Sequence, residues 1–159
     1  MKLFITRPLP APVVDAARKV FDVDVRDNTA VMNADELRAS LRDYDVVLPT
    51  LGDMYSADVF ADVPEARAKM LANFGVGFNH IDTDAARSAG VEVTNTPGAV
   101  TDATADIAMT LMLMSARRAG EGERMVRANE WEGWHPTQML GLHLSGKHVG
   151  IVGMGRIGQ

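Results

Sequence analysis

Residues 147–159 read Lys-His-Val-Gly-Ile-Val-Gly-Met-Gly-Arg-Ile-Gly-Gln, a strand pattern followed by a glycine motif. The apolar residues 149–152 predict a β-strand that runs directly into G-x-G-x-x-G at Gly153, Gly155 and Gly158. A strand, turn and helix of this kind bind a dinucleotide pyrophosphate, because the glycines permit a tight turn and close approach to the phosphates. One strand cannot make a Rossmann domain, so we expect the chain to be the front part of a larger enzyme.

The glycine motif leaves several ligands open. A glycine-rich turn without a nucleotide, a flavin site and an S-adenosylmethionine site are alternatives to NAD or NADP. The acidic residue that separates NAD from NADP is expected about 20 positions after the motif. That position lies beyond Gln159, so either cofactor fits this sequence.

Upstream, residues 1–98 alternate short apolar strands with helical patterns. Strands are predicted at residues 3–5, 23–25, 46–48, 70–72 and 91–93. Helices are predicted from Pro12, from a capping box at Asn33 to Glu36, within 56–61, and from Asp82 or Thr83. This alternation predicts an α/β domain with a flavodoxin-like parallel sheet of about five strands, covered on both faces.

A phosphate-receiver domain has the same architecture. It requires an acidic cluster after the first strand and an Asp after the third. The chain has Thr6-Arg7-Pro8 and Pro49-Thr50 at these places, which argues against a receiver.

Between the two patterns, a long helix is predicted over residues 101–129, followed by a loop over 130–146. The middle of this helix, residues 103–116, is apolar on nearly every side. It is therefore expected to be buried, either in the core or between domains and a dimer partner. Trp131 and Trp134 in the loop are expected to pack as anchors.

The charge is uneven along the chain. Residues 1–98 hold 10 Lys and Arg against 15 Asp and Glu, whereas residues 99–159 hold 6 of each, which gives the net charge of −5. An acidic first domain argues against nucleic acid and anionic membranes as partners. The chain has no cysteine and no apolar run of roughly 18–20 residues, so we expect a cytoplasmic protein without a membrane span.

The loop over residues 73–82 directly follows a predicted strand. Ligands bind at such strand ends in parallel sheets, and Gly75 and Gly77 allow backbone N–H groups to face a carboxylate or phosphate. An ordinary strand–helix turn is the alternative. The four histidines have no metal-ligand spacing and are expected to be exposed or hydrogen-bonded structural residues: His80, His135, His143 and His148.

Taken together, these stretches resemble the D-isomer-specific 2-hydroxyacid dehydrogenases, and among them glyoxylate/hydroxypyruvate reductases. The matching segments are residues 73–82, 95–113, 133–137, 141–147 and the glycine motif. The resemblance implies a substrate domain over 1–98 and the truncated start of an NAD(P)-binding domain over 99–159. It also implies NAD(P)H-dependent reduction of a small 2-oxo acid to the D-2-hydroxy acid.

The resemblance also assigns roles to individual residues. Val76, Gly77 and Leu51 would bind the substrate, with the loop to Asp53 lining the same cleft. Residues that would contact the cofactor are Thr104, Gly153, Met154, Gly155, Arg156, Ile157 and Gly158. Trp134 would reach the substrate cleft of the other subunit in a homodimer formed through residues 101–129.

The family's acid–base chemistry uses an Arg, a Glu and a His that follow the glycine motif. None maps onto this chain, so the 159 residues alone are expected to be inactive. The alternative is an NAD(H)-binding, co-repressor-like dimer scaffold without essential catalysis. Residues downstream of the motif, or binding of a partner peptide, would separate the two.

Overall fold

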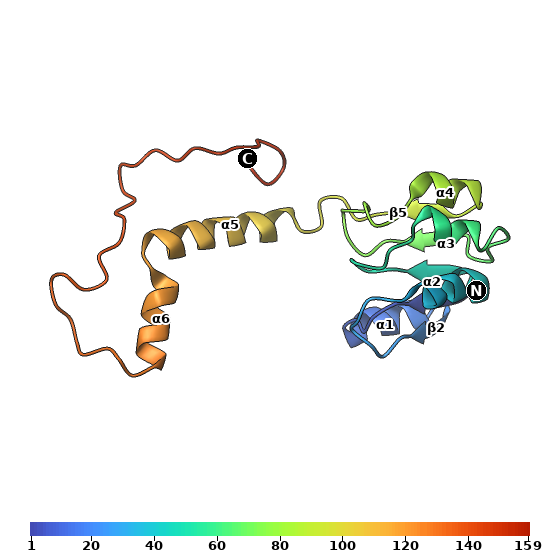
Figure 1. Ribbon diagram of the computed structural model, residues 1–159, viewed down its shortest axis with the longest axis horizontal. Helices are drawn as coiled ribbons and strands as arrows, with labels where there is room; N and C mark the ends of the chain where they lie inside the picture. The colour runs from blue at the N-terminus through green and yellow to red at the C-terminus, as the bar shows by residue number, and fades with distance from the viewer. The chain divides into compact units, whose positions relative to one another are not determined.

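A computed structural model describes residues 1–159 of the protein. The chain forms two compact units, Met1–Ala99 and Val100–Gln159, and each is described by itself. In Figure 1 the first unit is coloured blue to green and holds a sheet flanked by helices. The second unit, yellow to red, contains two helices and a long segment without regular structure.

The sheet of the first unit has five parallel strands in the order β2-β1-β3-β4-β5. The strands are β1 (Lys2–Ile5), β2 (Asp22–Val25), β3 (Val46–Leu48), β4 (Met70–Ala72) and β5 (Glu92–Thr94). This is the flavodoxin-like order, which confirms the predicted fold class for this unit. β5 starts one residue later than predicted, because the Val91 N–H bonds the Ala86 carbonyl, 2.9 Å away, at the end of the preceding helix.

Four helices connect the strands: α1 (Ala11–Arg18), α2 (Ala34–Asp43), α3 (Ala57–Ala61) and α4 (Thr83–Ser88). Two separate apolar clusters show that they cover both faces of the sheet. Val14 of α1 packs with Leu3 and Ile5 of β1. The larger cluster joins α2, α3 and α4 to the opposite side, with members such as Leu41 and Phe60.

Local signals place these helices. The Asn33 side chain accepts hydrogen bonds from the N–H groups of Asp35 and Glu36, both at 3.0 Å, while the Glu36 carboxylate accepts from the Asn33 N–H at 2.9 Å. This is the predicted capping box, and it satisfies donors that a helix start leaves free. Asp82 caps α4 through the Ala85 N–H at 2.9 Å.

The second unit corrects the prediction of one helix over 101–129. The segment forms α5 (Thr101–Ala116) and α6 (Ala119–Arg127). Between them Arg118 adopts a left-handed conformation with φ of 53°, which interrupts the helical hydrogen-bond ladder. Its guanidinium group donates to the Glu121 carboxylate, with Nε–Oε2 of 2.8 Å, and to the Leu140 carbonyl at 3.3 Å.

Helix α5 also differs from its predicted burial, since none of its residues is buried. Five of its large apolar side chains are between 39% and 59% exposed: Ile107, Met109, Leu111, Leu113 and Met114. A helix that is apolar all round needs a neighbour on every side. Within residues 100–159, α6 is the element that packs against it.

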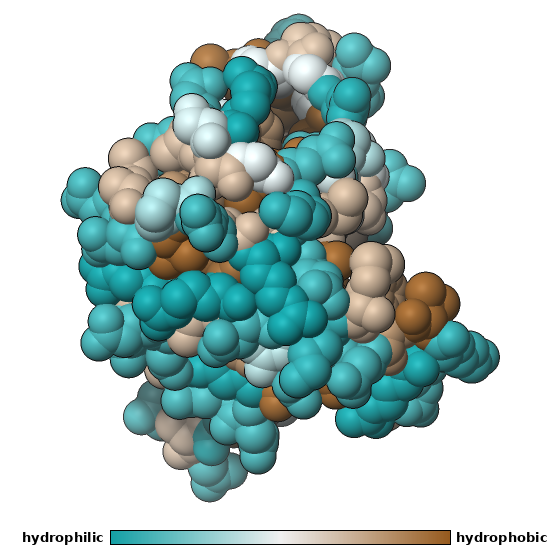
Figure 2. Space-filling view, turned by 90° about the vertical axis from the view of Figure 1, so that its right-hand side faces the viewer, coloured by the Kyte–Doolittle hydropathy of each residue, from teal (hydrophilic) through white to brown (hydrophobic).

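The predicted strand over residues 149–152 is not formed. A strand needs a hydrogen-bonded neighbour, and no segment pairs with these residues. No helix combines the length and apolar character needed to cross a bilayer. Figure 2 shows a face on which hydrophilic residues predominate and apolar residues form small, separate groups.

Candidate functional site

The loop over residues 73–82 lies at the carboxyl end of β4, beside the loop that follows β3. The Phe74 N–H donates to the Pro49 carbonyl at 2.9 Å, and the Asp82 N–H donates to the Tyr55 carbonyl at 2.8 Å. A Cβ atom placed on Gly75 would lie 3.9 Å from Cδ2 of Leu51. The structure therefore brings Leu51, whose side chain is exposed, to the loop that contains Val76 and Gly77.

Three successive carbonyl oxygens of this loop are bound by side-chain amides. Asn73 Nδ2 donates to the carbonyls of Gly75 at 3.1 Å and Gly77 at 2.9 Å. Asn95 Nδ2 donates to the Val76 carbonyl, also at 2.9 Å. Asn73 itself is buried. Sequence reasoning missed both asparagines, although their positions at the ends of the neighbouring strands β4 and β5 were an available signal.

The N–H groups of Val76 and Gly77, in contrast, bond no group of the chain. Both residues are exposed, and a Cβ atom on Gly77 would meet no other atom within 4 Å. Adjacent free backbone donors form an anion-binding surface. The loop can therefore bind a carboxylate or phosphate from the solvent side.

The His80 side chain forms a hydrogen bond within the protein. Its Nε2 lies 3.1 Å from Oδ1 of Asn73, which confirms the expected hydrogen-bonded structural role. Burial lowers the pKa of His80, against the opposing effect of the Asp53 charge. His80 therefore favours the neutral imidazole form.

Within the loop at residues 51–53, which the resemblance places along the substrate cleft, the Asp53 side chain faces the protein interior. Its side chain is fully buried and bonds to Arg7, with Oδ1–Nη2 of 3.1 Å. Arg7 Nη1 also donates to the Leu51 carbonyl at 3.1 Å. The pair thus lies behind the exposed Leu51. Opposite charges after the neighbouring strands β1 and β3 were the signal for this pair in the sequence.

The glycine motif ends in a hydrogen-bonded turn over residues 156–158. Gly153 has φ of 100°, a left-handed conformation that favours glycine. A Cβ atom on Gly158 would overlap the carbonyl oxygen of Gly153, whereas one on Gly155 would meet nothing within 4 Å. The Gln159 N–H donates to the Gly155 carbonyl at 3.2 Å, as in a first helical turn. The backbone therefore requires glycine at positions 153 and 158, as in the motif that binds a dinucleotide pyrophosphate.

The other predicted cofactor residues are all exposed in the same unit. Met154, Arg156 and Ile157 are exposed within the motif. Thr104 lies on α5, and its hydroxyl donates to the Val100 carbonyl of its own helix at 2.7 Å.

The two tryptophans do not anchor their loop. Trp134 is 81% exposed and Trp131 is 56% exposed, with Trp131 Nε1 lying 3.3 Å from Oε1 of Gln138. The loop over residues 130–146 has no regular structure, and both rings are largely exposed. Both indoles are free to contact another surface.

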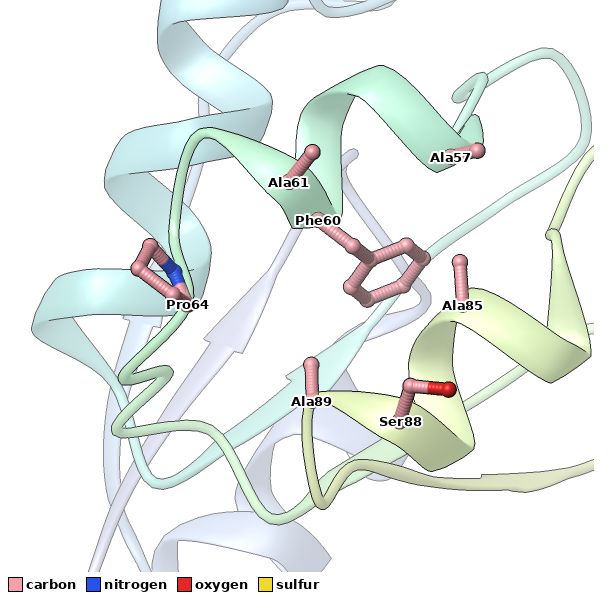
Figure 3. Close-up of a pocket in the computed structure, with 7 residues that line it drawn as sticks. All are labelled: Ala57, Phe60, Ala61, Pro64, Ala85, Ser88 and Ala89. Atoms are coloured by element: carbon pink, nitrogen blue, oxygen red, sulfur yellow. The ribbon is translucent and has the colours of Figure 1, made fainter.

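A cavity of about 290 Å³ lies between α3 and α4, away from the strand ends. Figure 3 shows its lining, in which the Phe60 ring points toward α4: Ala57, Phe60, Ala61, Pro64, Ala85, Ser88 and Ala89. The one side-chain hydroxyl in this set, Ser88 Oγ, donates to the Asp84 carbonyl at 2.9 Å. The lining of this cavity is therefore mostly apolar, and its one hydroxyl proton is already bonded within the protein. No group of His, Asp and Glu side chains in residues 1–159 could hold a metal ion.

Comparison with known proteins identifies a family and several relatives of the chain. The family model of the D-isomer specific 2-hydroxyacid dehydrogenase catalytic domain matches residues 3–148. A glycerate dehydrogenase of Hyphomicrobium methylovorum is 42% identical over 158 residues, which are 99% of this chain and 49% of that protein. A glyoxylate reductase of Thermococcus onnurineus is 40% identical over 162 residues, 99% of this chain and 48% of that protein.

A solved structure from Polaromonas sp. JS6 66, described as an NAD-binding D-isomer specific 2-hydroxyacid dehydrogenase, superposes with a TM-score of 0.91 at 38% identity. The match covers 99% of this chain and 49% of that chain. The chain thus spans about half the length of the relatives it matches.

Proposed function

Because the chain belongs to the D-isomer specific 2-hydroxyacid dehydrogenase family, we propose that the full-length protein reduces a small 2-oxo acid with NADH or NADPH. Glyoxylate and hydroxypyruvate are the proposed substrates, and the D-2-hydroxy acid is the product. Residues 1–98 act as the substrate domain, and residues 99–159 begin the cofactor domain. The relatives named glycerate dehydrogenase and glyoxylate reductase support this substrate class.

The observation that carries the proposal is the pair of unpaired N–H groups at Val76 and Gly77. They lie at the carboxyl edge of a parallel sheet, in the loop whose Gly75 comes close to the exposed Leu51 side chain. Two backbone donors suit the two oxygens of a carboxylate, and the apolar Leu51 suits a short carbon chain. We assign Val76 and Gly77 to the substrate carboxylate and Leu51 to the wall beside it.

The cofactor residues follow from the same reasoning. Gly153, Gly155 and Gly158 would hold the pyrophosphate, since the open side of Gly155 leaves room for its oxygens. Met154, Arg156 and Ile157 would lie over it, and Thr104 would lie near the nicotinamide. When bound, NAD(P)H supplies the hydride that adds to the carbonyl carbon. The residues of this chain bind and orient the 2-oxo acid. The proton donor to the carbonyl oxygen is proposed to be a His outside residues 1–159.

The proposal is tested by mixing the full-length protein with NADH or NADPH and either glyoxylate or hydroxypyruvate. We expect absorbance at the nicotinamide band to fall and the D-2-hydroxy acid to accumulate in equal amount. The 159-residue chain is the matched control and is expected to show no turnover. Absence of turnover with every small 2-oxo acid, together with retained NADH binding, would favour the dimer scaffold instead.

We further propose that the protein is a cytoplasmic homodimer joined through residues 101–129, without nucleic acid or membrane partners. The exposed apolar side chains of α5 support a protein partner, because a helix apolar on every side is stable only when covered. The exposed Trp134 is proposed to reach the other subunit's substrate cleft and limit substrate size.

Replacement of Trp134 is expected to change substrate choice. In the full-length protein, Trp134→Ala should raise kcat/KM for 2-oxo acids larger than hydroxypyruvate by about tenfold, equivalent to about 1.4 kcal/mol. Trp131→Ala in the same loop is the matched control and should leave the ratio of large to small substrates unchanged. Sedimentation reports the dimer in both variants. An unchanged substrate profile and oligomer in Trp134→Ala would refute the assignment.

A further inference from the structure

The hydrogen bonds around residues 75–77 occupy the carbonyl groups of this loop and leave N–H groups free. The carbonyls of Gly75 and Gly77 share the amide of Asn73, the Val76 carbonyl accepts from Asn95, and the Gly75 carbonyl also accepts from the Thr96 N–H. The N–H groups of Val76 and Gly77 bond nothing. A peptide unit whose carbonyl is held in one direction presents its N–H in the other. Asn95 therefore sets which way the Gly77 N–H faces, and Asn73 together with the Thr96 N–H sets the direction of the Val76 N–H.

The orientation of the Asn73 amide is itself fixed. Two carbonyl oxygens can only accept hydrogen bonds, so the nitrogen of the amide must face them. Its oxygen then faces His80, which must carry a proton on Nε2, at 3.1 Å. Both the neutral Nε2–H tautomer and the imidazolium satisfy this bond, so it persists across the titration of Nδ1. Because Asn73 is buried, the set has little freedom to rearrange.

From this arrangement we infer that Asn73 and Asn95 are positioning residues for the substrate carboxylate, and that His80 orients Asn73. The inference rests on the proposed function for the identity of the anion. Without the asparagines, the Val76 and Gly77 carbonyl oxygens would have no hydrogen bond to hold them and could turn toward the anion site, while the Gly75 carbonyl would keep only the Thr96 N–H. Their negative partial charges would then repel the carboxylate that the N–H groups bind. Asn73, Asn95 and His80 act through the backbone and do not touch the substrate.

Asn95 provides the decisive variants because its side chain is exposed and its replacement leaves the core intact. In the full-length protein, Asn95→Ala should raise the KM for glyoxylate about tenfold and change the KM for NADH or NADPH less than about twofold. Asn95→Asp has the same shape but no donor and adds a negative charge. It should raise the KM for glyoxylate about 100-fold, with part of the loss recovered at high salt.

Thr96 supplies the matched control. Its backbone N–H donates to the Gly75 carbonyl at 3.1 Å, so Thr96→Ala keeps this bond and alters only an exposed side chain. It should leave both KM values unchanged.

Variants in the core test the same inference. Asn73→Asp removes two donors in the core, and His80→Phe removes the bond that orients Asn73, whereas His80→Gln keeps a donor. We expect His80→Gln to recover much of the glyoxylate affinity that His80→Phe loses. If the Asn73 and His80 variants fail to fold, the KM values of Asn95→Ala and Asn95→Asp test the inference by themselves.

The outcomes separate this inference from the proposed function. If the wild-type protein turns over glyoxylate and both Asn95 variants keep its KM within about twofold, the inference is wrong and the function stands. If the wild-type protein turns over no 2-oxo acid, calorimetric titration with sodium oxamate decides the inference by itself. Weaker oxamate binding by Asn95→Asp than by Thr96→Ala would support it. Equal affinities, or no oxamate binding by the wild-type protein, would overturn it.

Discussion

Gly77→Val in the full-length protein should lower kcat/KM for glyoxylate by about 100-fold or more, equivalent to about 2.7 kcal/mol of lost binding. The isopropyl group would occupy the open space over the free N–H groups of residues 76 and 77. It would obstruct the approach of a carboxylate, so the loss should fall mainly on KM. The measurement is steady-state kinetics with glyoxylate as the varied substrate.

The fold should tolerate this change. Gly77 does not adopt a left-handed backbone, and a Cβ atom there meets no other atom within 4 Å. The free energy of unfolding should therefore change by less than about 0.5 kcal/mol. Gly77→Ala, with one methyl group, should give a smaller loss on the same scale. A loss of only a few-fold in Gly77→Val would count against carboxylate binding at this loop.

Asp53→Ala should lower the free energy of unfolding by about 3–5 kcal/mol. The carboxylate is fully buried and accepts from Thr6 Oγ1 at 2.7 Å, from the Thr50 N–H at 3.1 Å and from the Met32 N–H at 3.2 Å. Arg7 is the only positively charged residue that bonds this carboxylate. Removal of the carboxylate leaves the Arg7 charge and these donors without a partner. Urea denaturation followed by circular dichroism measures the loss.

A surface ion pair gives the matched control. Arg18 and Asp15 lie 3.6 Å apart with side chains 58% and 66% exposed. Asp15→Ala should change the free energy of unfolding by less than about 1 kcal/mol, because exposed pairs are well solvated. A similar small value for Asp53→Ala would show that the buried pair contributes no more than a surface one. Such a result would contradict the assignment of Asp53 to the core.

The sheet was predictable because its signals are local. The apolar triplets at residues 46–48 and 70–72 end at Pro49 and Asn73, and the structure places β3 and β4 there. The capping box of Asn33 and Glu36 likewise spans a single helical turn. In each case the residues that determine the element lie within a few positions of one another. Tertiary packing did not override these local preferences.

The remaining features depend on contacts that periodicity does not describe. The bond between Asp53 and Arg7 joins residues 46 positions apart, and it follows only once β1 and β3 are neighbours. The left-handed conformation of Arg118 was not predicted, because local sequence does not indicate it. The Arg118 side chain bonds the Leu140 carbonyl, which lies in a loop distant in the sequence. The burial of α5 was overestimated. Its apolar residues indicate that the helix packs against other protein surfaces, but the pattern does not indicate whether the same chain or another one provides them.

The candidate site was predictable to a similar extent. The glycines of the 73–82 loop indicated backbone donors, and the structure leaves those of Val76 and Gly77 unpaired. The sequence did not indicate which side chains hold the loop in this conformation. Asn73 and Asn95 directly follow different strands, and their amides bond the same loop only because β4 and β5 are adjacent.

The strand order has a consequence for how the chain folds as it is made. β2 pairs with β1, β3 adds to the free edge of β1, β4 adds to β3, and β5 adds to β4. Each strand therefore finds its partner already synthesised, and none has to enter between two strands that have paired. Translation runs from the N-terminus at rates that allow domains to fold in order. The sheet can grow outward on the ribosome one strand at a time, without breaking any earlier pair.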